Sequence, residues 1–339
     1  MAVTNYETLD DVTTTRTLLH ESIPLTGTIV SGTYNDDNIK NYTHGQFQSV
    51  YDYPYLSSSA NHIFDITVGY GESSTLSGSA GATLESKKIN MYNQFSQVLL
   101  GFTGSSNDVR KFELDTTLDG SGVMPEAFFL NFSRLLTKDQ IKKGTVSISL
   151  GRGIWADPFN TVLTLTDASA SATGGTANTL GGDYGVLYDG TNTAQGVVFY
   201  QSGIAVLSTS SFSGVATFYS SSTGMQNIAQ AFVSSSITAS CDALRHRLQN
   251  VSFNNTTEIN SSIYFCRVPH NKYNHSSNPT YLSSSTIRVK SVNTDAPVSY
   301  ITTVGLYSTD NELLAVAKLS EPLRKDPTNE ITLRVRLDY

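Results

Sequence analysis

The chain has 339 residues, of which 39% are hydrophobic and 15% are charged, and its formal net charge is −7 at pH 7. This length can bury the core of one large or two smaller domains, and the aromatic content of 10% argues against an intrinsically disordered chain. The negative charge gives no general attraction to phosphate backbones or anionic lipids. We therefore expect neither nucleic acid nor a membrane as a partner.

The amino terminus has neither the basic nor the apolar segment of a signal peptide, so we expect synthesis and assembly in a cytoplasm. Residues 1–60 contain turn signals, notably at 35–38 and 53–55, without a helical period. An extended arm with short strands is predicted there. Its aromatic side chains are expected to pack on other parts of the protein: Tyr42, Phe47, Tyr51, Tyr53 and Tyr55.

A strand is predicted at residues 63–68, followed by a Ser/Gly-rich loop at 73–83. The first main helix is predicted at about 88–101. Its apolar side chains recur at steps of three and four residues: Tyr92, Phe95, Leu99 and Phe102. Gly101 and Gly104 supply its end.

A second run, residues 128–136, has the composition of a strand. Residues 137–144 are predicted to form a single helical turn, with Thr137 as its N-cap and Gln140 at the capping-box position. Alternation of Val146, Ile148 and Leu150 with hydroxyl residues then predicts a half-buried strand. We assign residues 61–165 to an N-terminal α+β domain.

A loop and hairpin region is predicted over residues 166–222. Residues 167–182 are rich in Ala, Ser, Thr and Gly, which indicates a long exposed loop. Short strands are predicted at 185–188 and 197–200, and the second of these forms a tight hairpin with 204–207.

The second main helix is predicted at about 226–250. An apolar stripe supports it: Val233, Ile237, Cys241, Leu244, Leu248 and Val251. The serines at 234–236 make this helix intrinsically weak, so it needs packing to persist. Its stripe is buried either inside the subunit or against a helix of a neighbouring subunit.

The carboxyl end is predicted to be an antiparallel sheet, within a C-terminal α+β domain of residues 223–339. Strands at 301–307 and 313–319 form a hairpin, and a break follows at Pro322–Pro327. Residues 331–337 then alternate strictly between apolar and polar, which predicts one buried face. The fold class is therefore α+β, predominantly β, with antiparallel sheets and hairpins, two main helices and long loops.

Residues that could carry chemistry are few. Phosphate-loop, dinucleotide-loop and nucleophile-elbow motifs do not occur. The spacing of Cys266, His270 and His275 resembles zinc ligation superficially, but a structural zinc site needs four ligands. Two acidic pairs, at 10–11 and 36–37, could bind a cation or form turns. We expect Cys241 and Cys266 to remain thiols.

Four acidic residues could in principle supply the carboxylate pair of a glycoside hydrolase: Glu113, Asp115, Asp119 and Glu126. Solvated loop acids are the simpler interpretation. Residues 245–247 (Arg-His-Arg) form a basic group expected to face solvent or an acidic neighbour, and they are too few for nucleic-acid binding. We therefore predict no catalytic, cofactor-binding or metal-binding residues, no small-molecule substrate, and no enzyme activity.

Six segments carry a resemblance to a known family: 93–100, 126–143, 196–207, 273–281, 300–319 and 331–339. They resemble a family of virion structural proteins of tailed bacteriophages, as found in marine and cyanobacterial phages. The resemblance covers most of the chain after residue 30 and is most specific over the last 150 residues. It implies no catalytic residues and no cofactor.

The resemblance implies a tail or baseplate component of the virion, assembled with other copies of itself and with neighbouring tail, baseplate or neck proteins. Three alternatives remain open at this point. The chain could be a neck or connector subunit, or a receptor-binding or fibre-associated protein with a variable tip at 167–182. It could also be a tail-associated glycan hydrolase that uses Glu113 and Glu126.

Overall fold

The structure is a computed structural model that describes residues 11–26, 38–52, 61–103, 108–115, 120–176, 178, 180–221, 224–276, 279–284, 286–287, 292, 294 and 296–339. The chain forms two compact units. Unit 1 comprises Met1–Leu18 and Glu258–Tyr339, and unit 2 comprises Leu19–Thr257. These limits differ from the expected boundaries near 60, 165 and 222, because strand pairing between distant segments defines the units.

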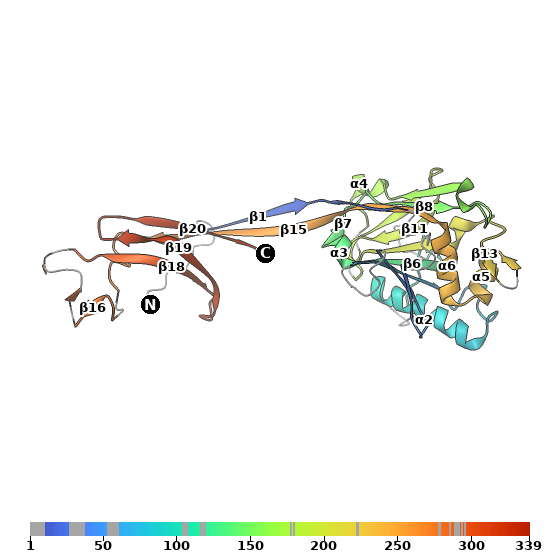
Figure 1. The fold of residues 1–339 in the computed structure, drawn as a ribbon, viewed down its shortest axis with the longest axis horizontal. Coiled ribbons are helices and arrows are strands. Elements are labelled where there is room, and N and C mark those ends of the chain that lie inside the picture. Colours follow the sequence, from blue (N-terminus) through green and yellow to red (C-terminus); the bar gives the residue numbers. More distant parts are fainter. Residues whose placement is uncertain are drawn as a thin grey trace. The chain divides into compact units, whose positions relative to one another are not determined.

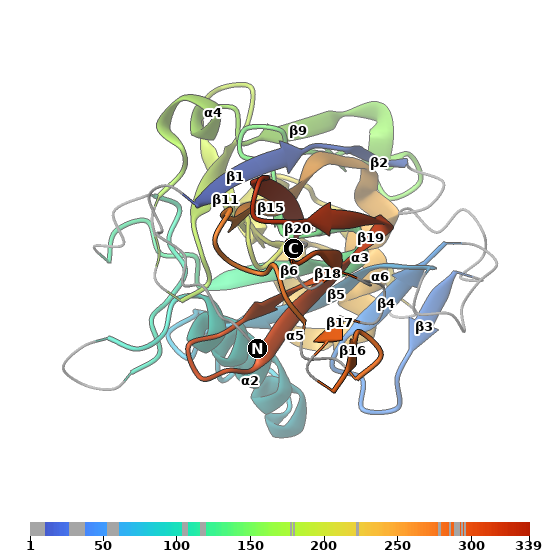
Figure 2. The ribbon, with the colours of Figure 1, turned by 90° about the vertical axis from the view of Figure 1, so that its left-hand side faces the viewer.

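A long antiparallel sheet organises unit 2 (Figure 1). In spatial order its strands are β3 (Ile39–Asn41), β4 (Gln48–Tyr51), β5 (His62–Tyr70), β6 (Glu126–Phe132), β12 (Ile204–Ser208), β11 (Ala194–Phe199), β10 (Tyr184–Tyr188), β9 (Val162–Thr166), β8 (Ser147–Gly151) and the first part of β15 (Leu248–Val268). Figure 2 shows β3, β4 and β5 side by side. The predicted strands at 63–68, 146–150, 185–188, 197–200 and 204–207 are confirmed.

Alternating side chains give this sheet two buried faces. On β6, Phe128, Leu130 and Phe132 belong to one hydrophobic cluster, whereas Ala127 and Phe129 belong to a second. Successive residues of a strand point to opposite faces, so β6 contributes to both clusters. A strand that is apolar at nearly every position is typical of the middle of a sheet covered on both sides.

Helices cover both faces. α2 (Ala82–Leu99) adds Tyr92 and Leu99 to the second cluster. α5 (Ile228–Ser234) and α6 (Ile237–Arg247) pack into the first cluster. The predicted helix at 88–101 is therefore confirmed, although it begins about two turns earlier. None of the helices in the described ranges is long and apolar enough to cross a membrane.

The predicted continuous helix at 226–250 is wrong. Ser235 ends α5, and the Ser236 hydroxyl accepts a hydrogen bond from the Ala239 amide to begin α6. Serine competes with helical hydrogen bonds and is favoured at caps, so the pair divides the helix. From Leu248 the chain is already strand β15. Apart from the half-buried Val233, the apolar stripe is nevertheless buried inside unit 2, which is one of the two alternatives predicted.

Two local predictions are also wrong. The helical turn is α3 (Arg134–Thr137), which ends at Thr137, and β7 (Gln140–Ile141) follows it. The expected exposed loop at 167–182 contains α4 (Ser169–Thr173), and Asp167 at its start is fully buried. The Asp167 carboxylate accepts hydrogen bonds from the Gly144 and Val146 amides and from the Tyr200 hydroxyl, each at 2.8 Å.

Smaller elements complete unit 2. They are β2 (Ser22–Thr26), which pairs with β15, the hairpin β13 (Tyr219–Ser221) and β14 (Gly224–Gln226), and the 3-10 turns η2 (Pro158–Asn160) and η3 (Thr209–Phe212). Taken together, the elements define an α+β fold that is mostly β, as predicted.

The described part of unit 1 is built from strands and the segments that connect them. The second part of β15 pairs with β20 (Ile331–Asp338) and with β1 (Val12–Leu19). β18 (Ser299–Tyr307) and β19 (Leu313–Lys325) form the predicted hairpin, and β16 (Leu282–Ser283) pairs with β17 (Thr286–Ile287).

The expected break at Pro322 is wrong, because β19 continues to Lys325. The register shifts between Ile301 and Thr303, whose partners are Leu323 and Lys318. Pro322 therefore lies in an irregular part of the strand, where no regular ladder bond needs its missing amide proton.

Candidate functional site: an exposed apolar hairpin in unit 1

Buried apolar side chains are distributed very unequally between the two units. Every described residue of both hydrophobic clusters belongs to unit 2. Among the described residues of unit 1, only Val268, Leu306 and Val335 are buried hydrophobics. Burial of apolar surface is the dominant favourable contribution to folding, at about 25 cal/mol per Å². Unit 1 therefore obtains little of this stabilisation from its own packing.

Apart from Leu18, Val292 and Tyr339, the large apolar residues that the described part of unit 1 leaves exposed lie on β18 and β19. We call this set the hairpin surface, and it comprises Tyr300, Tyr307, Leu313, Leu314, Val316 and Leu323. Leu314 is 68% exposed and Val316 is 52% exposed. Scattered exposed apolar residues are normal on monomers, but a contiguous group on one element marks an interaction site.

Strand register explains why these side chains point outward. Val304 pairs with Ala317 and Leu306 with Ala315, and these positions are half-buried or buried. The alternate pair, Gly305 and Val316, lies on the opposite face. A Cβ on Gly305 would lie 3.0 Å from the Tyr307 ring and 3.4 Å from Leu313 Cδ1, so both side chains lean over the glycine. Tyr307, Leu313 and Val316 therefore form an apolar group around Gly305. Tyr300 and Leu323 lie farther along the hairpin and on opposite faces of it, because they pair with the adjacent residues Arg324 and Ile301.

The hairpin surface is also unsupported by further strands. Within the described part of the chain, β18 and β19 pair only with each other. An isolated two-stranded hairpin is marginally stable in water, and an edge strand is a template for pairing with another chain. Among the residues that the structure describes, the outer edges of β18 and β19 are therefore open to such pairing.

Polar contacts fix the base of the hairpin. Lys325 is fully buried, and its ammonium donates to Asn274 Oδ1 at 2.6 Å and to the His270 carbonyl oxygen at 3.2 Å. The Ser299 hydroxyl donates to the Tyr273 carbonyl oxygen. The two strands are therefore anchored at one end by the segment after β15.

Charged side chains of unit 1 mostly pair within the unit. Arg267 lies 2.8 Å from Asp11, and Arg336 lies 2.7 Å from Asp338. A hydrogen bond from Ser261, together with Arg336, holds the pKa of Asp338 below its usual range. The sequence of unit 1 contains 11 acidic and 10 basic residues, so its net charge is −1. Unit 1 can meet a second copy without strong like-charge repulsion.

The structure does not bring the suspected zinc ligands together. His270 Nδ1 lies 3.0 Å from Glu330 Oε1, and the His275 ring packs edge-on against Tyr281. Cys266 and Cys241 are free thiols. In the described ranges, no group of three or more His, Cys, Asp or Glu side chains could hold a metal ion. Asp11 pairs with Arg267, whereas Asp10, Asp36 and Asp37 lie outside the described residues.

The acidic residues considered for glycan hydrolysis have other local partners. Glu113 is buried, and its Oε1 accepts a hydrogen bond from the Gly120 amide at 3.0 Å. Glu126 accepts from the hydroxyl groups of Ser74 and Thr209. Asp115 is half-buried, and Asp119 lies outside the described residues.

The basic group at 245–247 does not face solvent, so the first of its two expected surroundings is wrong. Arg247 is fully buried, and its guanidinium donates to four carbonyl oxygens, those of Gly151, Gly153, Thr217 and Phe218. His246 stacks on Trp155 with ring centroids 4.1 Å apart. Of the two possibilities expected, only an acidic neighbour is found, at Arg245.

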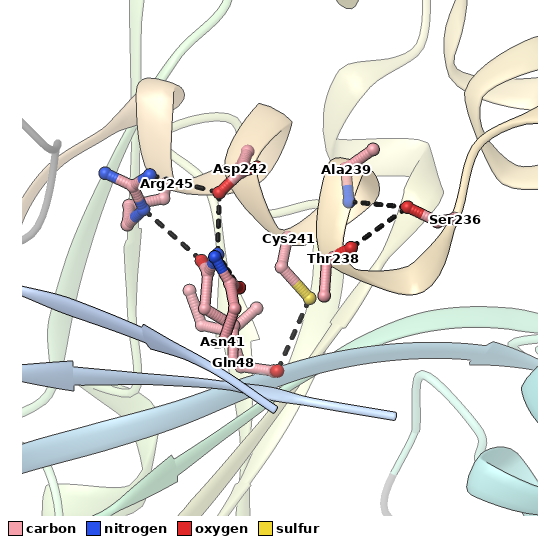
Figure 3. A network of polar contacts seen from close by, with 9 residues as sticks. Asn41, Gln48, Ser236, Thr238, Ala239, Cys241, Asp242 and Arg245 are labelled. Carbon is pink, nitrogen blue, oxygen red and sulfur yellow. Dashed lines mark hydrogen bonds and ion pairs between the residues drawn. The ribbon is translucent and has the colours of Figure 1, made fainter. Parts of the chain in front are cut away.

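Arg245 belongs to a polar network between α6 and the β3–β4 hairpin (Figure 3). Asp242 Oδ1 accepts hydrogen bonds from Arg245 at 3.0 Å and from the Gln48 amide at 2.7 Å. Gln48 also donates to Asn41 Oδ1 at 2.9 Å. These pairings satisfy groups that packing has removed from water, so the network orients α6 on the sheet.

The alternation at 331–337 is confirmed, since Leu333, Val335 and Leu337 are each less exposed than their polar neighbours. The exposed apolar surface of the neighbouring hairpin was not predicted. Leu313 and Leu314 are adjacent apolar residues at the start of a strand, and alternation cannot bury both on one face. The adjacent leucines were therefore the feature of the sequence that could have indicated an exposed apolar surface on this hairpin.

Comparisons with known proteins give no identification. No protein-family model, no curated protein and no solved structure matches the chain. Function is therefore inferred from the hairpin surface and from the sequence resemblance described above.

Proposed function

We propose that the chain is a structural subunit that acts by protein–protein assembly, and that a second copy of the chain covers the hairpin surface. The observation that carries this proposal is the contrast between an exposed apolar hairpin and a unit whose described residues form almost no apolar core. Obligate interfaces resemble a domain core cut in half and are more hydrophobic than transient ones. The hairpin surface has this character.

A second copy is the occupant that the charge of unit 1 favours. With 11 acidic and 10 basic residues, unit 1 has no strong net field that would select an oppositely charged partner. Most soluble oligomers are homo-oligomers, whose symmetric interfaces bring the same patch of each copy together. Apolar packing between copies then supplies the stabilisation that unit 1 lacks.

The particle to which this assembly belongs is proposed from the sequence resemblance alone. We propose a tail or baseplate component of a tailed-bacteriophage virion, with neighbouring tail, baseplate or neck proteins as further partners. Mass spectrometry of purified particles tests this part: the chain should be present at a copy number that matches the symmetry of its site. Its absence from the particles would refute the virion role and leave self-assembly to be judged separately.

Sedimentation velocity of the full chain tests self-assembly. We expect the wild-type protein to sediment as an oligomer and the double variant Leu314→Asp/Val316→Asp to shift to a single chain of 36.7 kDa. Two exposed residues of unit 2, Ile154 (63%) and Leu135 (51%), offer a control of matched exposure. The Ile154→Asp/Leu135→Asp variant should remain oligomeric. A monomeric wild type, or equal dissociation of both variants, would contradict the proposal.

A further inference from the structure

A groove in unit 2 lies between α2 and the neighbouring face of the sheet. Its volume is about 280 Å³, and its lining includes Phe47, Asp65, Thr67, Gln94, Phe95 and Asn131. Small-molecule sites are concave, mostly apolar and supplied with a few placed polar groups, in volumes of ~300–1,000 Å³. The groove therefore lies just below the lower end of this range, which suits a ligand of one or two small rings.

Strand register builds the polar wall of this groove. Asp65 on β5 stands directly opposite Asn131 on β6, which in turn stands opposite Ile204 on β12. On the other side, Asp65 pairs with Ser49 of β4. Cross-strand partners share one face of a sheet, so these side chains form a single row. Ser49, Asp65 and Asn131 therefore place polar groups next to one another on this face of the sheet.

The Asp65 carboxylate is held in place by its neighbours. Its Oδ1 accepts hydrogen bonds from the Ser49 hydroxyl at 2.5 Å and from His62 Nε2 at 2.8 Å. Ser49 is buried, so the carboxylate is oriented from behind. This arrangement fixes one oxygen and leaves the group able to accept further hydrogen bonds, since a carboxylate offers about four acceptor positions.

Two amide groups in the groove have unused hydrogen-bonding capacity. Within the described part of the chain, the side-chain amides of Asn131 and Gln94 make no hydrogen bond to protein. Each amide can donate and accept, and Asp65 accepts. A ligand hydroxyl also donates and accepts, so neighbouring hydroxyl groups on one ring match this set. An apolar occupant would cover the half-buried Asn131 amide and leave it unpaired, at a cost of about 1–3 kcal/mol.

The remaining lining selects for a neutral ring. Phe95 is stacked on Phe129 with centroids 4.4 Å apart, so its position is fixed, and Phe47 lines the same groove. Aromatic side chains offer a flat apolar surface to the C–H groups of a ligand. Among the described residues, no Lys, Arg or His lines the groove, so the lining offers no counter-charge for a phosphate or a carboxylate. Asp65 already pairs with His62, which weakens its attraction for a cation.

We propose that this groove binds a neutral saccharide, at the scale of one or two sugar rings. Asp65, Asn131 and Gln94 would bind ring hydroxyls, and Phe47 and Phe95 would contact the C–H groups. The inference goes beyond the assembly role and rests on different residues. Loss of oligomerisation would therefore not remove it, and failure to bind sugars would not affect the assembly proposal.

Saturation-transfer-difference NMR and calorimetry with the full chain test the proposal. The probes are glucose, galactose, mannose and N-acetylglucosamine, with glycerol as an acyclic control. We expect at least one sugar to bind saturably and more tightly than glycerol. Failure of all four sugars to bind, or equal binding of glycerol, would overturn the inference.

Two glutamines on α2 provide a matched pair of variants. Gln94 lines the groove, whereas Gln97 is exposed on the same helix outside the groove lining. Gln94→Ala should weaken sugar binding about fivefold or more, as expected for one lost hydrogen bond, and Gln97→Ala should leave binding unchanged. Asn131→Leu should weaken binding further. Equal affinity of the two glutamine variants would overturn the inference even if Asn131→Leu fails to fold.

Discussion

Gly69 of β5 lies directly against the backbone of α2 at Tyr92. A Cβ added to Gly69 would lie 2.8 Å from the Tyr92 amide nitrogen and 2.6 Å from the Lys88 carbonyl oxygen. Distances below 3.0 Å between a Cβ and backbone atoms are not tolerated without movement. Glycine at this position therefore sets how closely the helix approaches the sheet, and with it the depth of the groove beside α2.

Gly69→Ala should destabilise unit 2 by about 1–3 kcal/mol, because the added methyl group forces the helix away from the strand. Gly71 offers a matched control, since a Cβ there would meet only the Tyr92 ring at 3.4 Å, an ordinary contact. Gly71→Ala should change the free energy of unfolding by less than about 1 kcal/mol. Urea unfolding of both variants checks this, and equal losses would contradict the packing described.

Arg247→Met should destabilise the protein by about 3–5 kcal/mol, because it leaves four buried carbonyl oxygens without their donor. Burial lowers the pKa of Arg247 to about 10, which reflects the cost of removing this charge from water. Arg152, whose guanidinium donates to the Ser213 carbonyl oxygen at an exposed position, is the control. Arg152→Met should cost less than about 1 kcal/mol in the same urea titration. A small effect at position 247 would mean that the guanidinium is dispensable.

Lys88 should make stability depend on pH in the alkaline range. Its ammonium donates to the carbonyl oxygens of Phe232 and of Ser235, the latter at 2.7 Å. Burial lowers its pKa from 10.5 to about 8, although the neighbouring Cys241 opposes this shift. Between these two pKa values the unfolded chain binds more protons than the folded chain, so stability rises with pH.

Lys88→Met separates this effect from that of other groups. From about pH 7.5 to about pH 9.5, the wild type should gain about 1–2 kcal/mol of unfolding free energy relative to the variant. The buried Tyr184, whose pKa burial raises to about 12, titrates in both proteins and cancels in the difference. Urea titrations of both proteins under reducing conditions, repeated across this pH range, measure the difference in unfolding free energy. A difference that is flat across this range would show that Lys88 keeps an ordinary pKa.

The sequence predicted most strands because their signal is local. Val146, Ile148 and Leu150 alternate with polar residues, and tight turns such as 201–203 fix the pairing of neighbouring strands. The helix at 226–250 was misjudged because the apolar spacing continues into β15, where Leu248 and Val251 are buried as strand residues. Apolar spacing alone cannot distinguish a continuous helix from a helix followed by a strand. The break between α5 and α6 depends on Ser236, which caps the second helix.

Buried polar groups could not be predicted in the same way. The sequence around Arg247 resembles a solvated basic segment, and its four acceptors come from residues 29 to 96 positions away. The groove likewise depends on the register that places Asp65 beside Asn131, two residues 66 positions apart in sequence. Sites of this kind can be recognised only once the pairing of the strands is known. The hairpin of β18 and β19, by contrast, was predicted from local sequence. Its exposed apolar surface requires one further fact from the structure, namely that no other described strand pairs with it.

Site-specific photo-crosslinking tests the central claim, that a second copy covers the hairpin surface. A benzophenone amino acid in place of Val316 should give, on irradiation of the full chain, a covalent species at a multiple of 36.7 kDa. The same group in place of Ile154, an exposed residue of unit 2, should leave the chain at its single mass. A single-chain mass at position 316, or equal crosslinking at both positions, would contradict assembly through the hairpin.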